Sequence, residues 1–230
     1  MNYGREYFER IYNASREGEL ISKARAEILF EKVASLRRVL DVGCGFGDFL
    51  SSVQKRGAKV SGVDISGYAL AQARRRVHGV LKKVDVARQR LPFKNDWFDA
   101  ITIFDVVEHL HSPMFLFSEA FRVLRPGGVL FITTPNHQGW LRSVTTRIFP
   151  DDPTHVNVRA SRYWAKRLFE AGFRDLRVQG AILHGLPPLP GVRRTLEQWN
   201  FPVFRGPLFF PFKKLCGTLY IFGNKPYQSF

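Results

Sequence analysis

Three glycines at alternate positions are the clearest chemical signal in the sequence. A short apolar run that contains Asp41 leads into Gly43, Gly45 and Gly47. Glycines after a strand let backbone N–H groups approach a bound molecule closely, so this segment predicts a ligand-binding turn. The dinucleotide fingerprint needs a glycine at its sixth position, where this chain has Asp48. A G-x-G pair alone would also fit a tight turn without a ligand.

Alternating strands and helices must position this turn. Apolar runs predict seven strands, at residues 39–42, 58–63, 80–86, 98–104, 129–133, 174–183 and 218–222. Helical spacing predicts helices at residues 5–35, 48–56, 67–77, 112–124 and 161–171. Ser66 is placed to cap the third helix, and Gly172 follows the last one. This alternation favours right-handed crossovers and a mostly parallel sheet covered by helices on both faces.

Composition and charge limit the classes of protein to consider. The chain has 230 residues, of which 45% are hydrophobic and 24% charged, so wholesale disorder is excluded. Two cysteines and an N-terminus without an apolar segment are typical of a cytoplasmic protein. The sequence has no apolar stretch long enough to span a membrane. The net charge of +15 is compatible with phosphate-bearing partners or an anionic membrane, without deciding between them.

Four further segments follow the glycine turn in a fixed order. They are Val63–Ser66, Val84–Val86, Phe98–Leu110 and Leu124–Leu130. Over residues 36–173 the chain therefore resembles the class I S-adenosylmethionine-dependent methyltransferases, and within them the small-molecule branch with the ubiquinone-biosynthesis O-methyltransferases. The resemblance implies S-adenosylmethionine as the cofactor. It also implies an α/β fold, a Rossmann-like three-layer sandwich with a seven-stranded, mostly parallel sheet and an antiparallel last strand.

Two carboxylates at predicted strand ends acquire cofactor roles through this resemblance. Asp64 ends the second strand and would accept two hydrogen bonds from the ribose diol. Asp85 ends the third strand and would accept a hydrogen bond from the adenine amino group, while the N–H of Val86 would donate to a ring nitrogen. Each acid also has a plainer interpretation: Asp64 could complement the dipole of the following helix, and Asp85 could be a loop acid.

Four more residues complete the implied cofactor site. Asp41 would lie beneath the glycine turn, near the amino group and sulfonium of the cofactor, or would accept structural hydrogen bonds from the turn. Ile65 would pack against the adenine or the ribose, the alternative being a place in the core. Phe104 and Asp105 follow the fourth strand and would pass the methionine half of the cofactor.

Two histidines are the candidates for a general base. The sulfonium makes the methyl group electrophilic, so in-line transfer needs no metal and no protein nucleophile, only positioning and a base where the acceptor is protonated. His109 lies in the segment after the fourth strand, and His155 lies in a segment that the resemblance places beside the acceptor pocket. The alternative for His109 is a structural histidine whose hydrogen bonds hold its loop.

The predicted reaction is methyl transfer to an oxygen, nitrogen or carbon of a small or lipophilic molecule. Phe104–Val107 replaces the Asn/Asp-Pro-Pro-aromatic motif of enzymes that methylate amino groups of adenine or glutamine. Cys44 and Cys216 are not placed to serve as the nucleophile of pyrimidine carbon-5 methylation. Two alternatives stay open: an RNA-directed methyltransferase, less favoured because no RNA-binding module is evident, and a non-catalytic scaffold with the cofactor fold.

The segment 184–216 departs from the alternating pattern. It holds six prolines, and five phenylalanines and three cations occur between residues 201 and 215. We expect the whole chain, residues 1–230, to form one domain with a helical N-terminal segment at 1–36 and a lid-like insertion at 184–216. An apolar, basic insertion could instead admit a lipid-like acceptor or touch an anionic membrane. The sequence makes no prediction about the oligomeric state.

Overall fold

The computed structural model describes residues 3–12, 15–138, 152–181, 209–210 and 216–227. The helices in these ranges are α1 (Arg5–Tyr12), α2 (Ser15–Lys32), α3 (Asp48–Gln54), α4 (Gly67–Ala73), the 3₁₀ turn η1 (Val107–His109), α5 (Met114–Val123) and α7 (Ser161–Glu170). The strands are β1 (Arg38–Val42), β2 (Lys59–Asp64), β3 (Val80–Lys83), β4 (Phe98–Phe104), β5 (Leu124–Pro135), β6 (Arg174–Ala181), β7 (Phe209–Phe210) and β8 (Thr218–Asn224).

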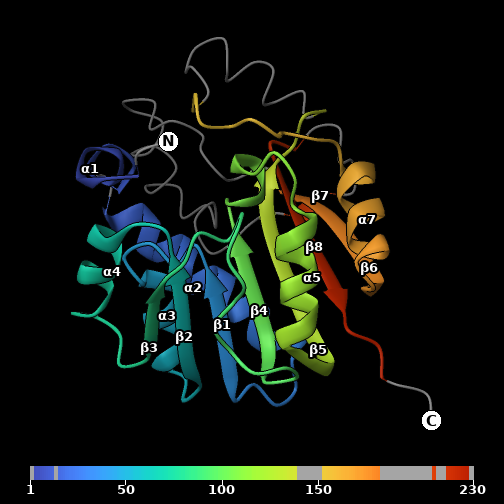
Figure 1. The fold of residues 1–230 in the computed structure, drawn as a ribbon, viewed down its shortest axis with the longest axis horizontal. Coiled ribbons are helices and arrows are strands. Elements are labelled where there is room, and N and C mark those ends of the chain that lie inside the picture. The colour runs from blue at the N-terminus through green and yellow to red at the C-terminus, as the bar shows by residue number, and fades with distance from the viewer. Residues whose placement is uncertain (1–2, 13–14, 139–151, 182–208, 211–215, 228–230) are drawn as a thin grey trace, which may run out of the picture.

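One sheet organises the described residues, in the order β3-β2-β1-β4-β5-β8-β6-β7 (Figure 1). The first five strands in this order are parallel, and β8 runs antiparallel to both β5 and β6. The seven longer strands confirm the predicted α/β fold class with its antiparallel last strand. The carboxyl ends of the parallel strands meet at one edge of the sheet, the edge at which ligands bind in open α/β folds.

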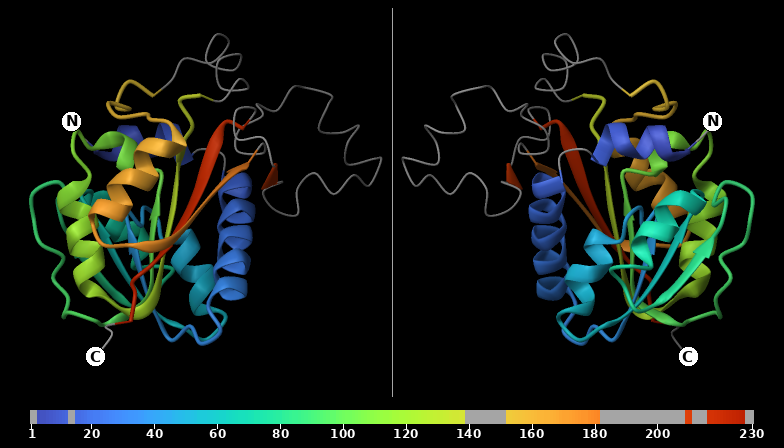
Figure 2. Two further views of the ribbon diagram at one scale, coloured as in Figure 1. Left: turned by 90° about the vertical axis from the view of Figure 1, so that its right-hand side faces the viewer. Right: turned by 90° about the vertical axis from the view of Figure 1, so that its left-hand side faces the viewer.

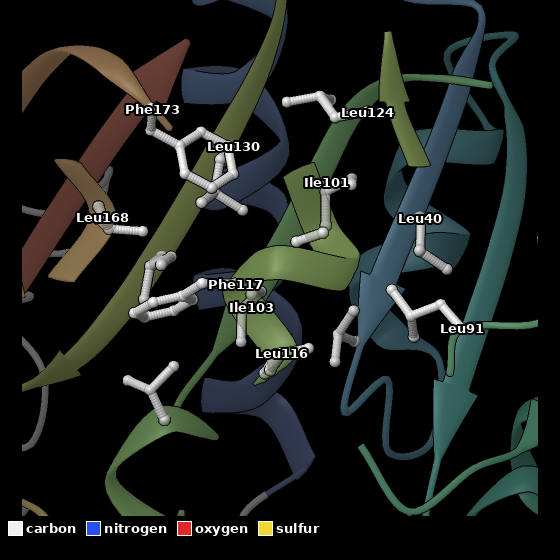
Figure 3. Packing of buried hydrophobic residues seen from close by; sticks show 14 of the residues in the cluster. Leu40, Leu91, Ile101, Ile103, Leu116, Phe117, Leu124, Leu130, Leu168 and Phe173 are labelled. Carbon is white, nitrogen blue, oxygen red and sulfur yellow. The ribbon is translucent and has the colours of Figure 1, made fainter. Parts of the chain in front are cut away.

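Helices cover both faces of the sheet, as the sequence predicts. Figure 2 shows α5 and α7 on one face and α2 and α3 on the other. Within each inner strand alternate residues enter different cores: Ile103 packs with α5 and α7, while Phe104 packs with α2 and α3. Figure 3 shows Phe117 of α5 beside Ile103 in the first of these cores. The strands whose ends form the candidate site are therefore packed between two apolar layers, one on each face of the sheet.

Local sequence signals explain where several helices begin and end. Ser66 caps α4, because its hydroxyl accepts a hydrogen bond from the N–H of Ala69 (3.2 Å), as predicted. Gly172 follows α7 with φ of 103°, a left-handed conformation that ends the helix as predicted. The helix expected at 5–35 is instead two helices, α1 and α2.

The sheet has one strand more than the sequence analysis expects. Residues 209–210 form β7, which pairs antiparallel with Gly180 and Ala181 at the edge of β6. This dipeptide belongs to the expected lid-like insertion at 184–216, which stays a prediction. Residues 182–208 and 211–215 lie outside the described residues. In the described ranges no helix combines the length and hydrophobicity that crossing a membrane requires.

Candidate functional site

The glycine turn joins the end of β1 to the start of α3. Its chain is held against β2, since the N–H groups of Gly43 and Cys44 both donate to the carbonyl of Val63 (2.8 and 3.1 Å). Gly43 adopts φ of 76°, and a Cβ atom at this position would collide with the side chain of Val106. Glycine is required there both for its backbone conformation and for the close approach of the chain after β4. The turn and that chain thus form one continuous surface.

Asp64 is buried at the end of β2, where its carboxylate is bound to the glycine turn. Its Oδ2 atom accepts a hydrogen bond from the N–H of Gly45 (2.9 Å), and its Oδ1 atom accepts one from the N–H of Ser66 (2.8 Å). Burial raises the pKa of Asp64, although hydrogen bonds from backbone N–H groups oppose the rise. Each carboxylate oxygen can accept a second bond, so the geometry leaves acceptor capacity for a ligand diol.

The residues predicted around an adenosine lie at the ends of β2 and β3. Ile65 is 39% exposed, so it is not a core residue and offers an apolar surface directly after Asp64. Asp85 and Val86 are half-buried, and one carboxylate oxygen of Asp85 accepts a hydrogen bond from the N–H of Ala87 (3.0 Å). This arrangement provides an apolar contact and a carboxylate on the same edge of the sheet.

Asp41 is buried at the end of β1, with 3% of its surface exposed. Its carboxylate accepts a hydrogen bond from the hydroxyl of Thr102 on β4 (2.6 Å) rather than from the glycine turn. Burial raises the pKa of Asp41 to about 7, against the lowering effects of the bond from Thr102 and the charge of Arg25. Asp41 can therefore change its charge state when a cation comes close.

Arg25 of α2 reaches the end of β4 and is a site residue that sequence reasoning missed. One of its guanidinium nitrogens donates to Oδ2 of Asp105 (2.7 Å) and to the hydroxyl of Thr133 (3.0 Å). The guanidinium also lies over the ring of Phe104, 4.4 Å from its centre. The ring of Phe104 packs into the core. Asp105 is held with φ of 54°, which turns the chain at the edge of the sheet.

The two candidate bases, His109 and His155, lie together although 46 positions separate them. Their ring centres are 4.9 Å apart. The Nδ1 atom of His109 lies 2.9 Å from the hydroxyl and 3.2 Å from the carbonyl of Thr154. Burial, followed by the neighbouring His155, lowers the pKa of His109 below its usual value.

Glu108 is fully buried beside these histidines and was not singled out by sequence reasoning. Its Oε2 atom accepts a hydrogen bond from the hydroxyl of Thr134 (3.2 Å), and its Oε1 atom has no hydrogen-bond partner among the described residues. Burial, followed by the charge of Asp105, raises the pKa of Glu108 well above its usual value. Glu108, His109 and His155 each offer a ligand atom within 4.8 Å of the others, a grouping that could hold a metal ion.

The N-terminal helix α1 lies next to α4, beyond the carboxyl ends of the strands (Figure 1). The ring of Phe8 stacks on Phe46 of the glycine turn, with 5.5 Å between ring centres. The hydroxyl of Tyr7 donates to Oδ2 of Asp152 (3.3 Å), and the ring of Tyr3 meets His109 edge-on at 6.0 Å. Helix α1 therefore contacts the glycine turn and Asp152, and Tyr3, just before the helix, contacts His109.

Comparison with known protein families agrees with this site. Residues 12–178, most of the chain, match the model of a family described as a methyltransferase domain. The chain belongs to this methyltransferase family. The class expected from the sequence, S-adenosylmethionine-dependent methyltransferases, is thereby confirmed, and with it S-adenosylmethionine as the cofactor of the family.

Curated relatives of this chain are named as methyltransferases. A ubiquinone biosynthesis O-methyltransferase of Alkalilimnicola ehrlichii is 35% identical over 106 residues, which cover 44% of this chain and 42% of the relative. A probable S-adenosylmethionine-dependent methyltransferase of Mycolicibacterium smegmatis is 32% identical over 170 residues, 70% of this chain and 62% of the relative. The matched part of this chain spans about half the length of such relatives.

Solved structures share the fold of this methyltransferase. A methyltransferase of Thermotoga maritima, described as a possible histamine N-methyltransferase, has a TM-score of 0.71 at 18% identity, covering 96% of this chain and 95% of that one. The phosphoethanolamine N-methyltransferase 2 of Haemonchus contortus has a TM-score of 0.62 at 21% identity, covering 88% of this chain and 52% of that one. Their different substrates indicate that the fold does not identify the acceptor.

The residues of this chain fit the cofactor of its family. Gly43 leaves room for close backbone approach, Asp64 has acceptor capacity, and the exposed Ile65 offers an apolar face beside it. The assignments of Asp41, Asp64, Asp85 and the other cofactor-contacting residues remain predictions, as do the roles of His109 and His155.

Proposed function

We propose that the protein transfers the methyl group of S-adenosylmethionine directly to a hydroxyl oxygen of a small or lipophilic molecule. The observation that carries this proposal is the place of His109, which follows the chain segment in contact with the glycine turn and lies 4.9 Å from His155 between ring centres. A neutral imidazole at this place can take the proton of a hydroxyl group as the oxygen attacks. The relatives named O-methyltransferases support oxygen as the acceptor atom.

The bound cofactor supplies an electrophilic methyl group, and the protein supplies binding, orientation and a base. Asp64 would hold the ribose, and Asp85 with Val86 would hold the adenine, between Ile65 and the glycine turn. Asp41 would face the positive charge of the cofactor, which favours its ionised form. Asp105, fixed by Arg25, would border the methionine half.

The acceptor would enter beside the histidine pair. We propose that His155, 4.9 Å from His109, helps to bind the acceptor. We also propose that residues 1–230 are one domain in the cytoplasm and that the insertion at residues 184–216 covers a lipophilic acceptor. An anionic membrane surface would then bring such an acceptor close to the basic protein, whose net charge is +15.

The test is methyl transfer to a panel of hydroxylated lipid and quinol-like acceptors, chosen by a thermal-shift screen with S-adenosylhomocysteine present. His109→Ala should lower turnover by about 10²–10⁴-fold and leave cofactor affinity nearly unchanged, because the base acts only on the acceptor. A turnover loss below about tenfold would remove His109 from the mechanism. Binding to anionic vesicles that weakens with salt would support membrane contact, and no binding at low salt would refute it.

A further inference from the structure

Thr154 makes two contacts with Nδ1 of His109 that bear on which nitrogen of this ring carries the proton. Its hydroxyl donates to Oδ1 of Asp152 at 2.7 Å and lies 2.9 Å from Nδ1 of His109. Its carbonyl oxygen lies 3.2 Å from the same Nδ1 atom. The backbone N–H of Thr154 also donates to Oδ1 of Asp152 (2.9 Å), so the two residues form a closed turn.

The backbone carbonyl of Thr154 decides the arrangement at this turn, because the hydroxyl of Thr154 also has the hydroxyls of Tyr3 and Tyr7 beside it. A threonine hydroxyl carries a single proton, and that of Thr154 is directed to the carboxylate of Asp152. The hydroxyl can then only accept from His109, and the carbonyl of Thr154 can only accept as well. Two acceptors that converge on Nδ1 require this nitrogen to carry the proton.

We propose that Thr154 and Asp152 are positioning residues that fix His109 as its Nδ1–H tautomer, leaving Nε2 as the basic nitrogen. Thr154 orients the ring, and Asp152 orients the hydroxyl of Thr154. The consequence for catalysis rests on the proposed function, in which His109 accepts the proton of the acceptor. The tautomer itself does not depend on that function, because it follows from the hydrogen bonds of the protein.

The surrounding structure holds this turn in place from two sides. The N–H groups of Val156 and Asn157 donate to the carbonyl of Glu108 (3.0 and 2.9 Å), which ties the turn to the segment after β4. From the other side, Tyr7 of α1 donates to Oδ2 of Asp152 (3.3 Å). Helix α1 and the chain after β4 therefore both fix the position of the Asp152 carboxylate.

The charge state of Asp152 agrees with its role as an acceptor. Burial alone would raise the pKa of Asp152, but the two hydrogen bonds from Thr154 and the nearby His155 and His109 lower it overall. Asp152 is therefore ionised near neutral pH and has no proton to donate to Thr154. Besides Asp152, the titratable groups around the ring of His109 are His155, Asp105, Glu108 and Tyr3.

The direct test is the tautomer of His109, read from the nitrogen chemical shifts and ring couplings of uniformly ¹⁵N-labelled protein. The His109→Gln variant identifies the resonances. The expected result is a protonated Nδ1 and an unprotonated Nε2 in the wild-type protein above the pKa of His109. A protonated Nε2 with a bare Nδ1 would overturn the proposal, whether or not the protein is an active methyltransferase.

A pair of variants separates the hydrogen bond from the shape of the side chain. Thr154→Val removes the hydroxyl and should give a mixture of tautomers, with turnover lowered about 10–100-fold at unchanged cofactor affinity. Thr154→Ser keeps the hydroxyl and should retain both the wild-type tautomer and most of the turnover. An unchanged tautomer in Thr154→Val would refute the role of the Thr154 hydroxyl, because the backbone carbonyl at position 154, which the substitution keeps, would then fix the tautomer alone. A shifted tautomer with unchanged turnover would contradict only the proposed role of His109 as the base.

Discussion

The Asp41→Asn substitution keeps the size of a buried side chain and removes its ability to ionise. The Oδ1 atom of Asp41 accepts the hydrogen bond from Thr102, and an asparagine oxygen can accept the same bond. Burial raises the pKa of Asp41 from 3.8 to about 7. The folded protein therefore retains a proton at pH values at which the unfolded chain has released it.

The sign of the effect on stability follows from this difference. A group with a raised folded-state pKa contributes its full stability below the unfolded value of 3.8, and this stability is lost as the pH rises through about 7. The shift of Asp41 corresponds to about 4 kcal/mol in the free energy of unfolding. Asparagine does not titrate, so the gain in stability from Asp41→Asn should be about 2–3 kcal/mol larger near pH 8 than near pH 5.

Urea unfolding without cofactor, followed at both pH values for both proteins, measures this difference. Thr102→Val is the matched control, because it removes the hydrogen bond to Asp41 and keeps the ionisable carboxyl group. This control should show at least the wild-type loss of stability as the pH rises. An equal effect of Asp41→Asn at the two pH values would refute the raised pKa and the reasoning built on it.

Three further predictions concern the core, metal dependence and the insertion. Phe117→Ala should lower the free energy of unfolding by about 3–5 kcal/mol, because the ring is fully buried between α5 and the sheet, and a loss below about 1 kcal/mol would contradict this packing. Dialysis against a chelator should leave methyl transfer unchanged, since displacement at a sulfonium needs no metal. A loss restored by zinc would instead indicate a metal at Glu108, His109 and His155. Deleting residues 184–208, which leaves β7 in place, should preserve S-adenosylhomocysteine binding and abolish methyl transfer. Loss of cofactor binding on deletion would show that the segment belongs to the core.

The parts of the fold that the sequence predicts are those fixed by local rules. Gly43 has a positive φ and no room for a side chain, so only glycine fits there, and this glycine in the sequence indicates the turn. Ser66 and Gly172 mark helix ends for similar local reasons. The alternation of apolar runs gives the order of strands and helices, and right-handed crossovers then give most of the sheet topology.

The parts that the sequence does not predict depend on contacts between distant positions. Tyr7 and Asp152 are 145 residues apart, and Arg25 and Asp105 are 80 apart, so neither pair has a local signal. The alternation of strand side chains turns the ring of Phe104 into the core, while the expectation that the chain at Phe104 passes the cofactor stays a prediction. The sequence does contain one sign of the buried ion pair: Arg25 lies among apolar positions of a predicted helix.

The most direct test of the cofactor site is calorimetric titration of the protein with S-adenosylhomocysteine. The wild-type protein should bind, and Asp64→Ala should weaken binding by about 1.5–3 kcal/mol, because the variant loses hydrogen bonds to a charged group. NADH, which suits the dinucleotide fingerprint that this chain lacks, should give no heat of binding under the same conditions. Absence of wild-type binding, or equal affinity in a folded Asp64→Ala variant, would contradict the assignment of the cofactor site.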